Sequence, residues 1–141
     1  MACCKIAFMK ISANSPCPCH SGKKYKQCCQ PYHKGTVPAT AVLLMRTRYS
    51  AYALGLADYI IKTTHPNNPD FTEDRADWKK NILHFSQDTV FEGLKIIEFI
   101  DGENEAFVTF EAALGNYAMK EKSRFLKENG RWLYESGEFP Q

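Results

Sequence analysis

Four cysteines near the start of the chain have the residue type and spacing of a metal site. Cys17 and Cys19 are separated by one residue, and the adjacent pair Cys28 and Cys29 follows after eight more. A short loop can bring four thiolates together, and four thiolates suit a tetrahedral zinc ion with Zn–S bonds of about 2.3 Å. Since four protein ligands leave no open coordination position, the expected zinc would be structural.

Other interpretations of these cysteines stay open at this stage. Disulfide pairing is the main rival, but residues 1–11 contain only a short apolar patch and no export signal, so we expect a reducing cytoplasm. Free buried thiols are the simplest alternative, yet this segment has few large apolar residues that could bury them. His20 or His33 could replace one cysteine as a ligand. Cys3 and Cys4 are expected to belong to a loose tail.

Local sequence features predict how the thiols converge. Pro16 and Pro18 favour an extended arm, because proline fixes its own φ and restricts the residue before it. Ser21-Gly22 supplies a turn. The segment 23–27 can form one helical turn that delivers the second cysteine pair.

Basic charge is concentrated in the same part of the chain. Residues 1–35 hold six lysines and no acidic residue, whereas the rest has 12 Lys and Arg against 16 Asp and Glu. We therefore expect two modules, a cysteine-rich head (residues 1–35) and a body (residues 36–141). Lysines near the thiolates would stabilise the formal −2 charge of a zinc ion with four thiolates. The expected partner-binding surface consists of Lys23, Lys24, Tyr25 and Lys26.

The body contains polar and aromatic residues that could line a ligand pocket, namely Arg48, Tyr49, Tyr52, His65, Arg124 and Trp132. The two arginines can hold a carboxylate or phosphate through paired N–H groups. Each candidate also has a structural interpretation. The tyrosines can be core residues with satisfied hydroxyls, Arg124 can pair with Glu111 across two strands, and His65 can fix the loop at Pro66.

An enzyme of the isomerase or hydratase type would need a carboxylate base opposite a hydrogen-bond donor. The nearest set is Asp58 with Tyr49 or Tyr52, although Asp58 stands where a helix cap is expected. The sequence shows no Ser-His-Asp order, no phosphate-binding glycine loop and no His-x-x-x-His pair. A non-enzymatic protein is therefore favoured, with such an enzyme as the alternative.

Three helices and then four strands are predicted for the body. Helical periodicity covers 39–54 and 57–64, and a third helix is capped by Thr72 and carries an inward stripe of Trp78, Ile82 and Phe85. Period-two patterns predict strands at 89–100, 105–114, 117–128 and 131–136.

Turn signals complete the fold prediction. Asp101-Gly102 and Asn129-Gly130 are preferred hairpin dipeptides, and Gly93 suggests a bulge. We expect an α+β fold in which three helices pack on a curved four-stranded antiparallel sheet.

Two resemblances agree with these expectations. The run Cys17-Pro-Cys-His-Ser-Gly-Lys-Lys-Tyr-Lys-Gln-Cys-Cys29 resembles the SEC-C motif, which implies zinc on the four cysteines. That motif usually has glycine at the position of His20. In the SecA translocation ATPase it contacts the chaperone SecB and the ribosome, so the resemblance implies a protein or ribosomal partner.

The body is similar to the nuclear-transport-factor-2-like (cystatin-like) cone fold. Segments 44–52, 58–66 and 123–134 resemble the YchJ family of small bacterial proteins, which joins an N-terminal SEC-C motif to a cone domain. The resemblance implies the fold and carries no settled activity.

Composition limits the remaining classes. The chain has 141 residues, of which 44% are hydrophobic, and this suits a globular domain. Since no apolar run reaches the roughly 18–20 residues of a membrane span, we expect no membrane contact. Six lysines are weak support for nucleic-acid binding. Charged residues on the outer sheet face favour a monomer or a weak homodimer.

Overall fold

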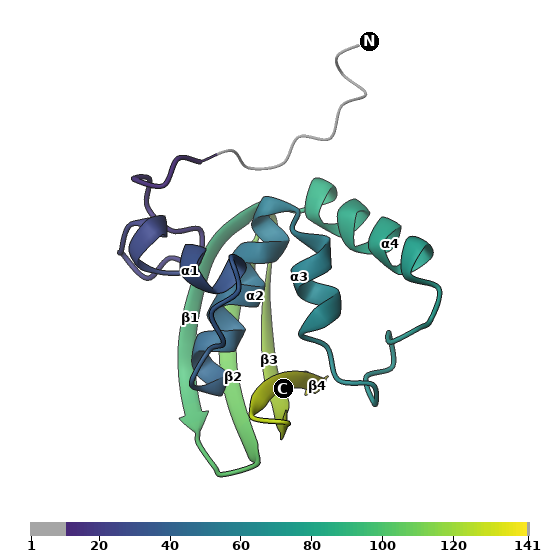
Figure 1. Cartoon of the computed structure of the whole chain (residues 1–141). Helices are drawn as coiled ribbons and strands as arrows, with labels where there is room; N and C mark the ends of the chain where they lie inside the picture. The colour runs from purple at the N-terminus through teal and green to yellow at the C-terminus, as the bar shows by residue number, and fades with distance from the viewer. Residues whose placement is uncertain (1–10, 141) are drawn as a thin grey trace.

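The computed structural model describes residues 11–140. Two short helical turns, η2 (Tyr25–Gln27) and α1 (Gln30–His33), lie in the head. Three longer helices follow, α2 (Ala41–Leu54), α3 (Ala57–Lys62) and α4 (Arg75–Asp88). The strands are β1 (Phe91–Ile100), β2 (Glu105–Leu114), β3 (Tyr117–Glu128) and β4 (Arg131–Glu138). The curved sheet bends around α2, and α3 and α4 lie beside it (Figure 1). The predicted α+β class is confirmed.

Side-chain caps and turns set the helix ends. α2 begins after Thr40, whose Oγ1 accepts a hydrogen bond from the backbone N–H of Leu43 at 3.2 Å, and it ends at Gly55 with φ 72°. α3 ends at Lys62, two residues earlier than predicted. Beyond it, the hydroxyls of Thr63 and Thr64 donate to backbone carbonyls one turn earlier and compete with continuation of the helix.

The cap predicted for the third helix was wrong. α4 begins after Asp74, whose Oδ1 accepts from the N–H of Asp77 at 3.0 Å. Thr72 instead accepts from the N–H of Asp74 at 3.1 Å. The acidic cap lies at the positive end of the helix dipole, which favours it there.

The four strands form an antiparallel meander in the order β1-β2-β3-β4. The strand predicted at 105–114 is confirmed, and its alternate residues are all buried, namely Ala106, Val108, Phe110, Ala112 and Leu114. A register shift between Phe91 and Gly93 confirms the predicted irregularity in β1. Asn129 and Gly130 both have positive φ, 53° and 78°, as a type I′ hairpin turn requires.

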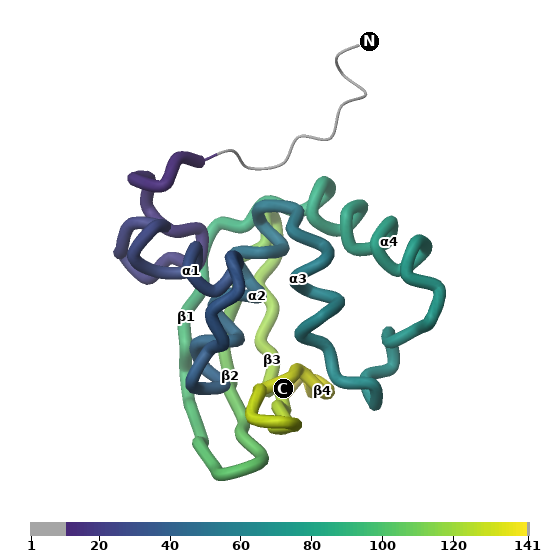
Figure 2. Tube along the Cα trace, in the orientation of Figure 1, coloured from purple at the N-terminus to yellow at the C-terminus, as the bar shows by residue number. Residues whose placement is uncertain are grey.

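One hydrophobic core includes residues of both head and body. Cys19 and Cys29 are buried in the same cluster as Leu44, Ile60 and Phe125. The trace of the head runs beside α2 and the upper end of β1 (Figure 2). Within residues 11–140, no helix has the length and apolar character needed to cross a membrane.

Candidate functional site

The four cysteines predicted as metal ligands lie together in the head. The Sγ atoms of Cys17, Cys19, Cys28 and Cys29 all lie within 4.8 Å of one another. A tetrahedral zinc ion with bonds of about 2.3 Å requires S–S separations of about 3.8 Å. Cys19 Sγ and Cys28 Sγ are 3.5 Å apart. The donor set can therefore hold one metal ion. Cys3 and Cys4 lie outside the described residues.

Backbone pairing brings the two cysteine pairs together. The N–H of Cys17 donates to the carbonyl of Lys23 at 2.8 Å, and the N–H of Tyr25 donates to the carbonyl of Ser15 at 2.9 Å. Between these arms the chain reverses at His20, with φ 62°, and at Gly22, with φ 88°. A left-handed φ at position 20 is easiest for glycine, so the conformation explains why the SEC-C motif usually has glycine there.

The body supplies a cation close to the thiols. Arg46 of α2 donates from Nη1 to the carbonyl of Cys19 at 3.2 Å and lies 3.9 Å from its Sγ. Ser21 Oγ lies 3.1 Å from Cys28 Sγ, and the Cys29 thiol donates to the carbonyl of Arg46 at 3.7 Å. Such surroundings orient the sulfur atoms and offset the negative charge of a metal–thiolate cluster.

Without a metal, the thiols share their protons unequally. Hydrogen bonds from Cys17 and then Cys29 lower the pKa of Cys19, which favours its thiolate. The hydrogen bond to Cys19, together with burial, raises the pKa of Cys17 to about 12, and the bonds to Cys17 and Cys19, together with burial, raise the pKa of Cys29. A bound metal ion would replace these protons, so metal uptake would release them to solvent.

Two residues of the head do not have the roles considered from sequence, which were partner binding for Tyr25 and metal binding for His33. Tyr25 is only 8% exposed, so it does not belong to the predicted partner-binding surface. Its hydroxyl donates to His33 Nδ1 at 2.6 Å, and His33 Nε2 donates to the carbonyl of Thr47 at 2.8 Å. Burial lowers the pKa of His33 and keeps the ring neutral. This chain of bonds fastens the head to α2.

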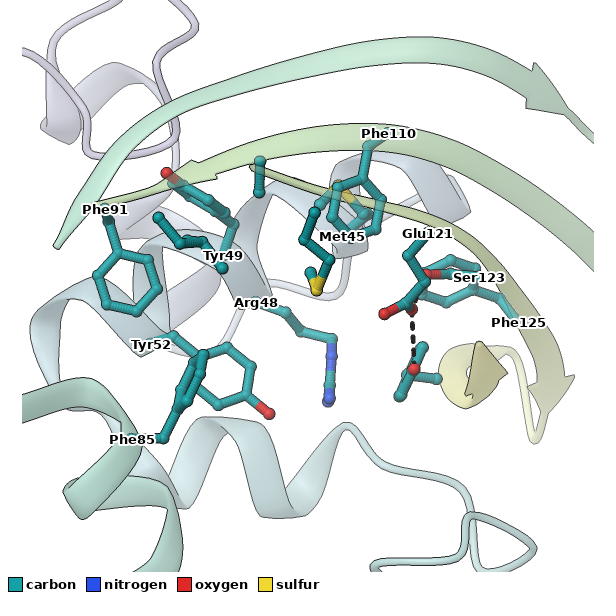
Figure 3. A pocket seen from close by; sticks show the side chains of 14 residues that line it. Met45, Arg48, Tyr49, Tyr52, Phe85, Phe91, Phe110, Glu121, Ser123 and Phe125 are labelled. Atoms are coloured by element: carbon teal, nitrogen blue, oxygen red, sulfur yellow. Dashed lines mark hydrogen bonds between the residues drawn. The ribbon is translucent and has the colours of Figure 1, made fainter. Parts of the chain in front are cut away.

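A cavity of about 220 Å³ lies between α2, α4 and the inner face of the sheet (Figure 3). Its walls are mainly apolar and include Met45, Phe85, Phe91, Phe110, Met119 and Phe125. Three of the six predicted pocket residues line it, namely Arg48, Tyr49 and Tyr52. The volume is below the roughly 300–1,000 Å³ of sites for drug-sized ligands, so only a small molecule would fit.

Arg48 brings a buried positive charge to this cavity. Its Nη1 donates to the carbonyl of Ile60 at 3.1 Å and to the hydroxyls of Thr63 and Thr64 at 2.8 and 3.1 Å. The guanidinium carbon lies 4.7 Å from the ring centre of Tyr134. One edge of the guanidinium is thus fixed by α3, while Figure 3 shows the group projecting into the cavity.

Glu121 brings a negative charge to the same cavity from β3. Its Oε2 accepts hydrogen bonds from Ser123 Oγ at 2.5 Å and from the Tyr134 hydroxyl at 2.9 Å. Burial and the charge of Glu121 raise the pKa of Tyr134, so that hydroxyl stays a neutral donor. Gly137 leaves room for the carboxylate, because a Cβ there would collide with it.

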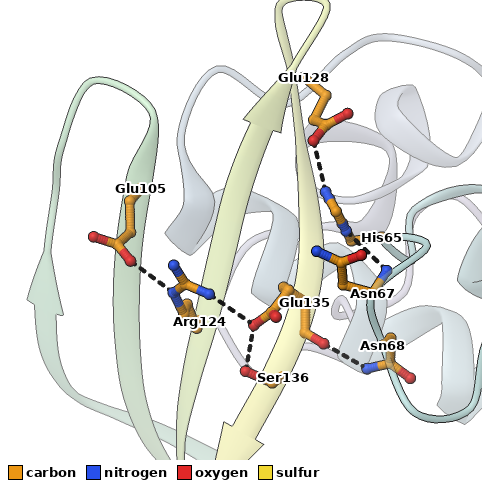
Figure 4. A network of polar contacts seen from close by, with 8 residues as sticks. All are labelled: His65, Asn67, Asn68, Glu105, Arg124, Glu128, Glu135 and Ser136. Atoms are coloured by element: carbon orange, nitrogen blue, oxygen red, sulfur yellow. Dashed lines mark hydrogen bonds and ion pairs between the residues drawn. The ribbon is translucent and has the colours of Figure 1, made fainter.

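The other three predicted pocket residues do not line this cavity, which corrects the expectation that all six converge. Arg124 alternates with Ser123 along β3 and points to the other face, where Nε donates to Glu105 at 2.6 Å and Nη1 lies 3.3 Å from Glu135 (Figure 4). Its predicted partner Glu111 lies opposite Lys120 instead.

His65 and Trp132 are buried for structural reasons. His65 Nε2 lies 2.7 Å from Glu128 Oε2, and its Nδ1 accepts from the N–H of Asn67 at 3.0 Å (Figure 4). Both ring nitrogens are therefore engaged. Trp132 lies beside a much smaller hollow near Tyr32, and the Lys127 ammonium lies 5.5 Å from its ring centre.

Asp58 does not form the isomerase-like set considered from sequence. Its side chain is 84% exposed and lies 3.5 Å from the Lys79 ammonium. It does not line the cavity that holds Tyr49 and Tyr52. The carboxylate of this cavity belongs to Glu121 instead.

Two family models match the chain. The model described as "YchJ, middle NTF2-like domain" covers residues 40–137, and the SEC-C motif covers residues 14–31. The chain belongs to the YchJ family. A UPF0225 protein of Vibrio parahaemolyticus is 39% identical over 90% of this chain and 77% of its own length. A UPF0225 protein of Deinococcus radiodurans is 40% identical over 84% and 85%.

Two solved structures share the fold of this YchJ family member. A SEC-C motif containing protein from Rhodopseudomonas palustris superposes with a TM-score of 0.76 and 31% identity, over 90% of this chain and 100% of that one. A second such protein, from Psychrobacter arcticus, gives a TM-score of 0.75 and 30% identity, over 92% and 85%. Head and cone domain therefore occur together in both relatives.

Sequence reasoning missed Glu121 in this YchJ family chain, although a signal was present. Alternate residues of β3 face the cavity, and they are Met119, Glu121, Ser123 and Phe125. A carboxylate between apolar and small residues on an inward face is unusual, because buried charges are rare unless they are paired. Reading the inward face of each strand for such a residue would have found it.

Proposed function

We propose that the YchJ-family head is a zinc-containing structural module that docks an acidic partner protein. The supporting observation is that one short loop keeps its thiols enclosed and its lysine charges on the surface. The four thiols face inward, with Cys17, Cys19 and Cys29 buried, whereas Lys23, Lys24 and Lys26 are exposed.

Four thiolate ligands favour zinc in a closed, structural site. Such a site has no position for substrate or water, so the head would act through its surface. Lys23, Lys24 and Lys26 form no ion pair with any residue that the structure describes, which leaves them free to meet carboxylates of a partner. Complementary charge of this kind mainly sets specificity and association rate.

Charge reversal tests the docking surface. The variant Lys23→Glu/Lys24→Glu/Lys26→Glu is compared with a control of equal charge change, Lys80→Glu/Lys95→Glu/Lys120→Glu, whose lysines are exposed on the body. Tagged proteins are crosslinked in bacterial lysate, with and without nuclease, and captured proteins are quantified by mass spectrometry. We expect an acidic protein whose capture falls about tenfold only in the head variant.

Two results would contradict the proposal. Capture that is equal in both triple variants would show that the head lysines do not dock the partner. Nuclease-sensitive capture of ribosomal proteins would replace the acidic protein with RNA. Elemental analysis of the purified chain tests the metal separately, and the expected result is one zinc per chain.

A further inference from the structure

The cavity holds two buried charges of opposite sign that are not paired with each other. Arg48 is 7% exposed and Glu121 is 8% exposed. Among the ion pairs formed by residues 11–140, neither side chain takes part. Burying a charge is costly unless a partner compensates it. Two such charges on opposite walls of one cavity therefore indicate a ligand.

The free edge of Arg48 is suited to a carboxylate. Its three hydrogen bonds, to Ile60 of α3 and to Thr63 and Thr64 just after this helix, all start from Nη1. The remaining N–H groups of a guanidinium form a planar fork that matches two carboxylate oxygens. Figure 3 shows this end of the side chain in the cavity, between Tyr52 and Glu121.

The free oxygen of Glu121 is suited to a donor. Both described hydrogen bonds of the carboxylate go to Oε2, from Ser123 and Tyr134. Among the described residues, Oε1 of Glu121 has no hydrogen-bond partner and is not fully enclosed, and Glu121 lines the cavity. An ammonium group there would pair with the carboxylate.

We propose that this cavity binds a free amino acid with an apolar side chain. The carboxylate of the ligand pairs with Arg48, its ammonium pairs with Glu121, and its side chain packs among Met45, Phe85 and Phe110. The cavity of about 220 Å³ accepts a molecule of this size, and its walls are otherwise mainly apolar, with the hydroxyl-bearing residues Tyr49, Tyr52, Ser123 and Tyr134 as the remaining polar lining. The site lies in the body and is independent of the head lysines.

A ligand with one charge would leave the other cavity charge uncompensated. A simple carboxylic acid would neutralise Arg48 and add a second negative group near Glu121. A simple amine would neutralise Glu121 and add a second positive group near Arg48. A molecule that carries both an ammonium and a carboxylate compensates both walls, and an α-amino acid carries these two groups on one carbon atom.

Calorimetric titration of the full chain at pH 7 tests this ligand class. The probes are L-leucine, its deaminated analogue 4-methylpentanoate and its decarboxylated analogue 3-methylbutylamine, with L-valine, L-methionine and L-phenylalanine to measure the side-chain preference. We expect saturable binding of at least one amino acid. Each single-charge analogue should bind at least about tenfold more weakly than leucine if leucine is the ligand, because one buried charge stays unpaired.

Substitution of Glu121 separates a binding role from a structural one. Glu121→Gln keeps an oxygen that can accept from Ser123 and Tyr134 but removes the charge, so amino-acid affinity should fall about tenfold while 4-methylpentanoate affinity holds or rises. Glu111→Gln, at an exposed carboxylate on β2, is the matched control and should change neither. Circular dichroism and melting temperature confirm the fold of each variant.

Three outcomes would overturn the proposal. The first is absence of saturable heat with all four amino acids. The second is analogue binding as tight as that of the parent amino acid. The third is unchanged amino-acid affinity in a folded Glu121→Gln variant.

Discussion

At the scale of single residues, Gly137 decides where the Glu121 carboxylate can lie. A Cβ at position 137 would be 2.7 Å from the Tyr134 hydroxyl and still closer to the Glu121 carboxylate. Real Cβ atoms do not approach other atoms so closely, so both groups would have to move. Because Gly137 has no side chain, the Glu121 carboxylate can take its place at the cavity, although Gly137 itself does not line the cavity.

Gly137→Ala should lower the free energy of unfolding by about 1–3 kcal/mol, because overpacking forces neighbouring side chains from their positions. Urea denaturation monitored by circular dichroism measures this loss. Gly93→Ala is the control, since its Cβ would meet Ala113 at an ordinary 3.5 Å, and its stability should change by less than about 1 kcal/mol. Equal stability of the two variants would show that Glu121 is not confined by Gly137.

The cluster of four cysteines could be predicted from sequence because its members are close along the chain. Two pairs separated by eight residues can converge through local turns alone. The pocket could be predicted only in part. Arg48, Tyr49 and Tyr52 share one helix, whereas the position of Glu121 depends on the pairing and curvature of strands far along the chain, which no local pattern specifies.

At the scale of secondary structure, α2 is bonded to the head, to α3 and to β1 through four consecutive residues. Arg46 contacts the metal loop, and the carbonyl of Thr47 accepts from His33. Arg48 bonds to α3, and the Tyr49 hydroxyl donates to the carbonyl of Gly93 in β1 at 3.0 Å. Because successive residues point in different directions around a helix, α2 is surrounded by neighbours.

The helix and strand boundaries followed from sequence where a cap or turn residue was present. The helix predicted at 39–54 ends at Leu54, with Gly55 in the left-handed region beyond it, and the turn at 129–130 lies where predicted. The end of α3 did not follow, because β4 imposes it. The N–H of His65 donates to the carbonyl of Tyr134 at 2.8 Å, and the N–H of Tyr134 donates to the carbonyl of Thr63 at 2.9 Å. Such long-range pairing overrides local helix propensity.

The loop after α3 should lose its anchor in a His65→Ala variant. Removal of the ring leaves the partners Glu128 and the Asn67 N–H without their bonds, and we expect a loss of about 1–3 kcal/mol in unfolding free energy. His84→Ala, at an exposed histidine of α4, is the control and should change stability by less than about 0.5 kcal/mol. Thermal and urea melts of both variants provide the comparison. A His65→Ala variant as stable as the control would refute the anchoring role.

At the scale of the whole molecule, the head is not an independently packed appendage. Its buried cysteines join the core of the body, and its bonds to Arg46 and Thr47 reach the centre of α2. Loss of the metal should therefore weaken the entire chain and not the head alone. The two predicted modules differ in composition but share their packing.

Chelation of the metal should lower the melting temperature by roughly 10 °C in a single transition, because a ligand that binds only the folded state stabilises all of it. Differential scanning calorimetry with and without a chelator measures the shift. Cys28→Ser provides the control, since a chelator should add no further shift once a ligand is lost. Metal release should be easier at lower pH, because protons compete for the thiolates. Two separate transitions, with that of the body unchanged, would contradict a shared core.

Tyr49 lies between the head and the cavity. Its ring packs edge-on against His20 at 5.8 Å and against Phe91 at 5.5 Å, and the same residue lines the cavity. Any shift of the metal loop that moves this ring changes the free energy of both sites. Thermodynamic linkage then makes the effect reciprocal. If a bound metal ion changes the affinity for a cavity ligand by some factor, that ligand changes the affinity for the ion by the same factor.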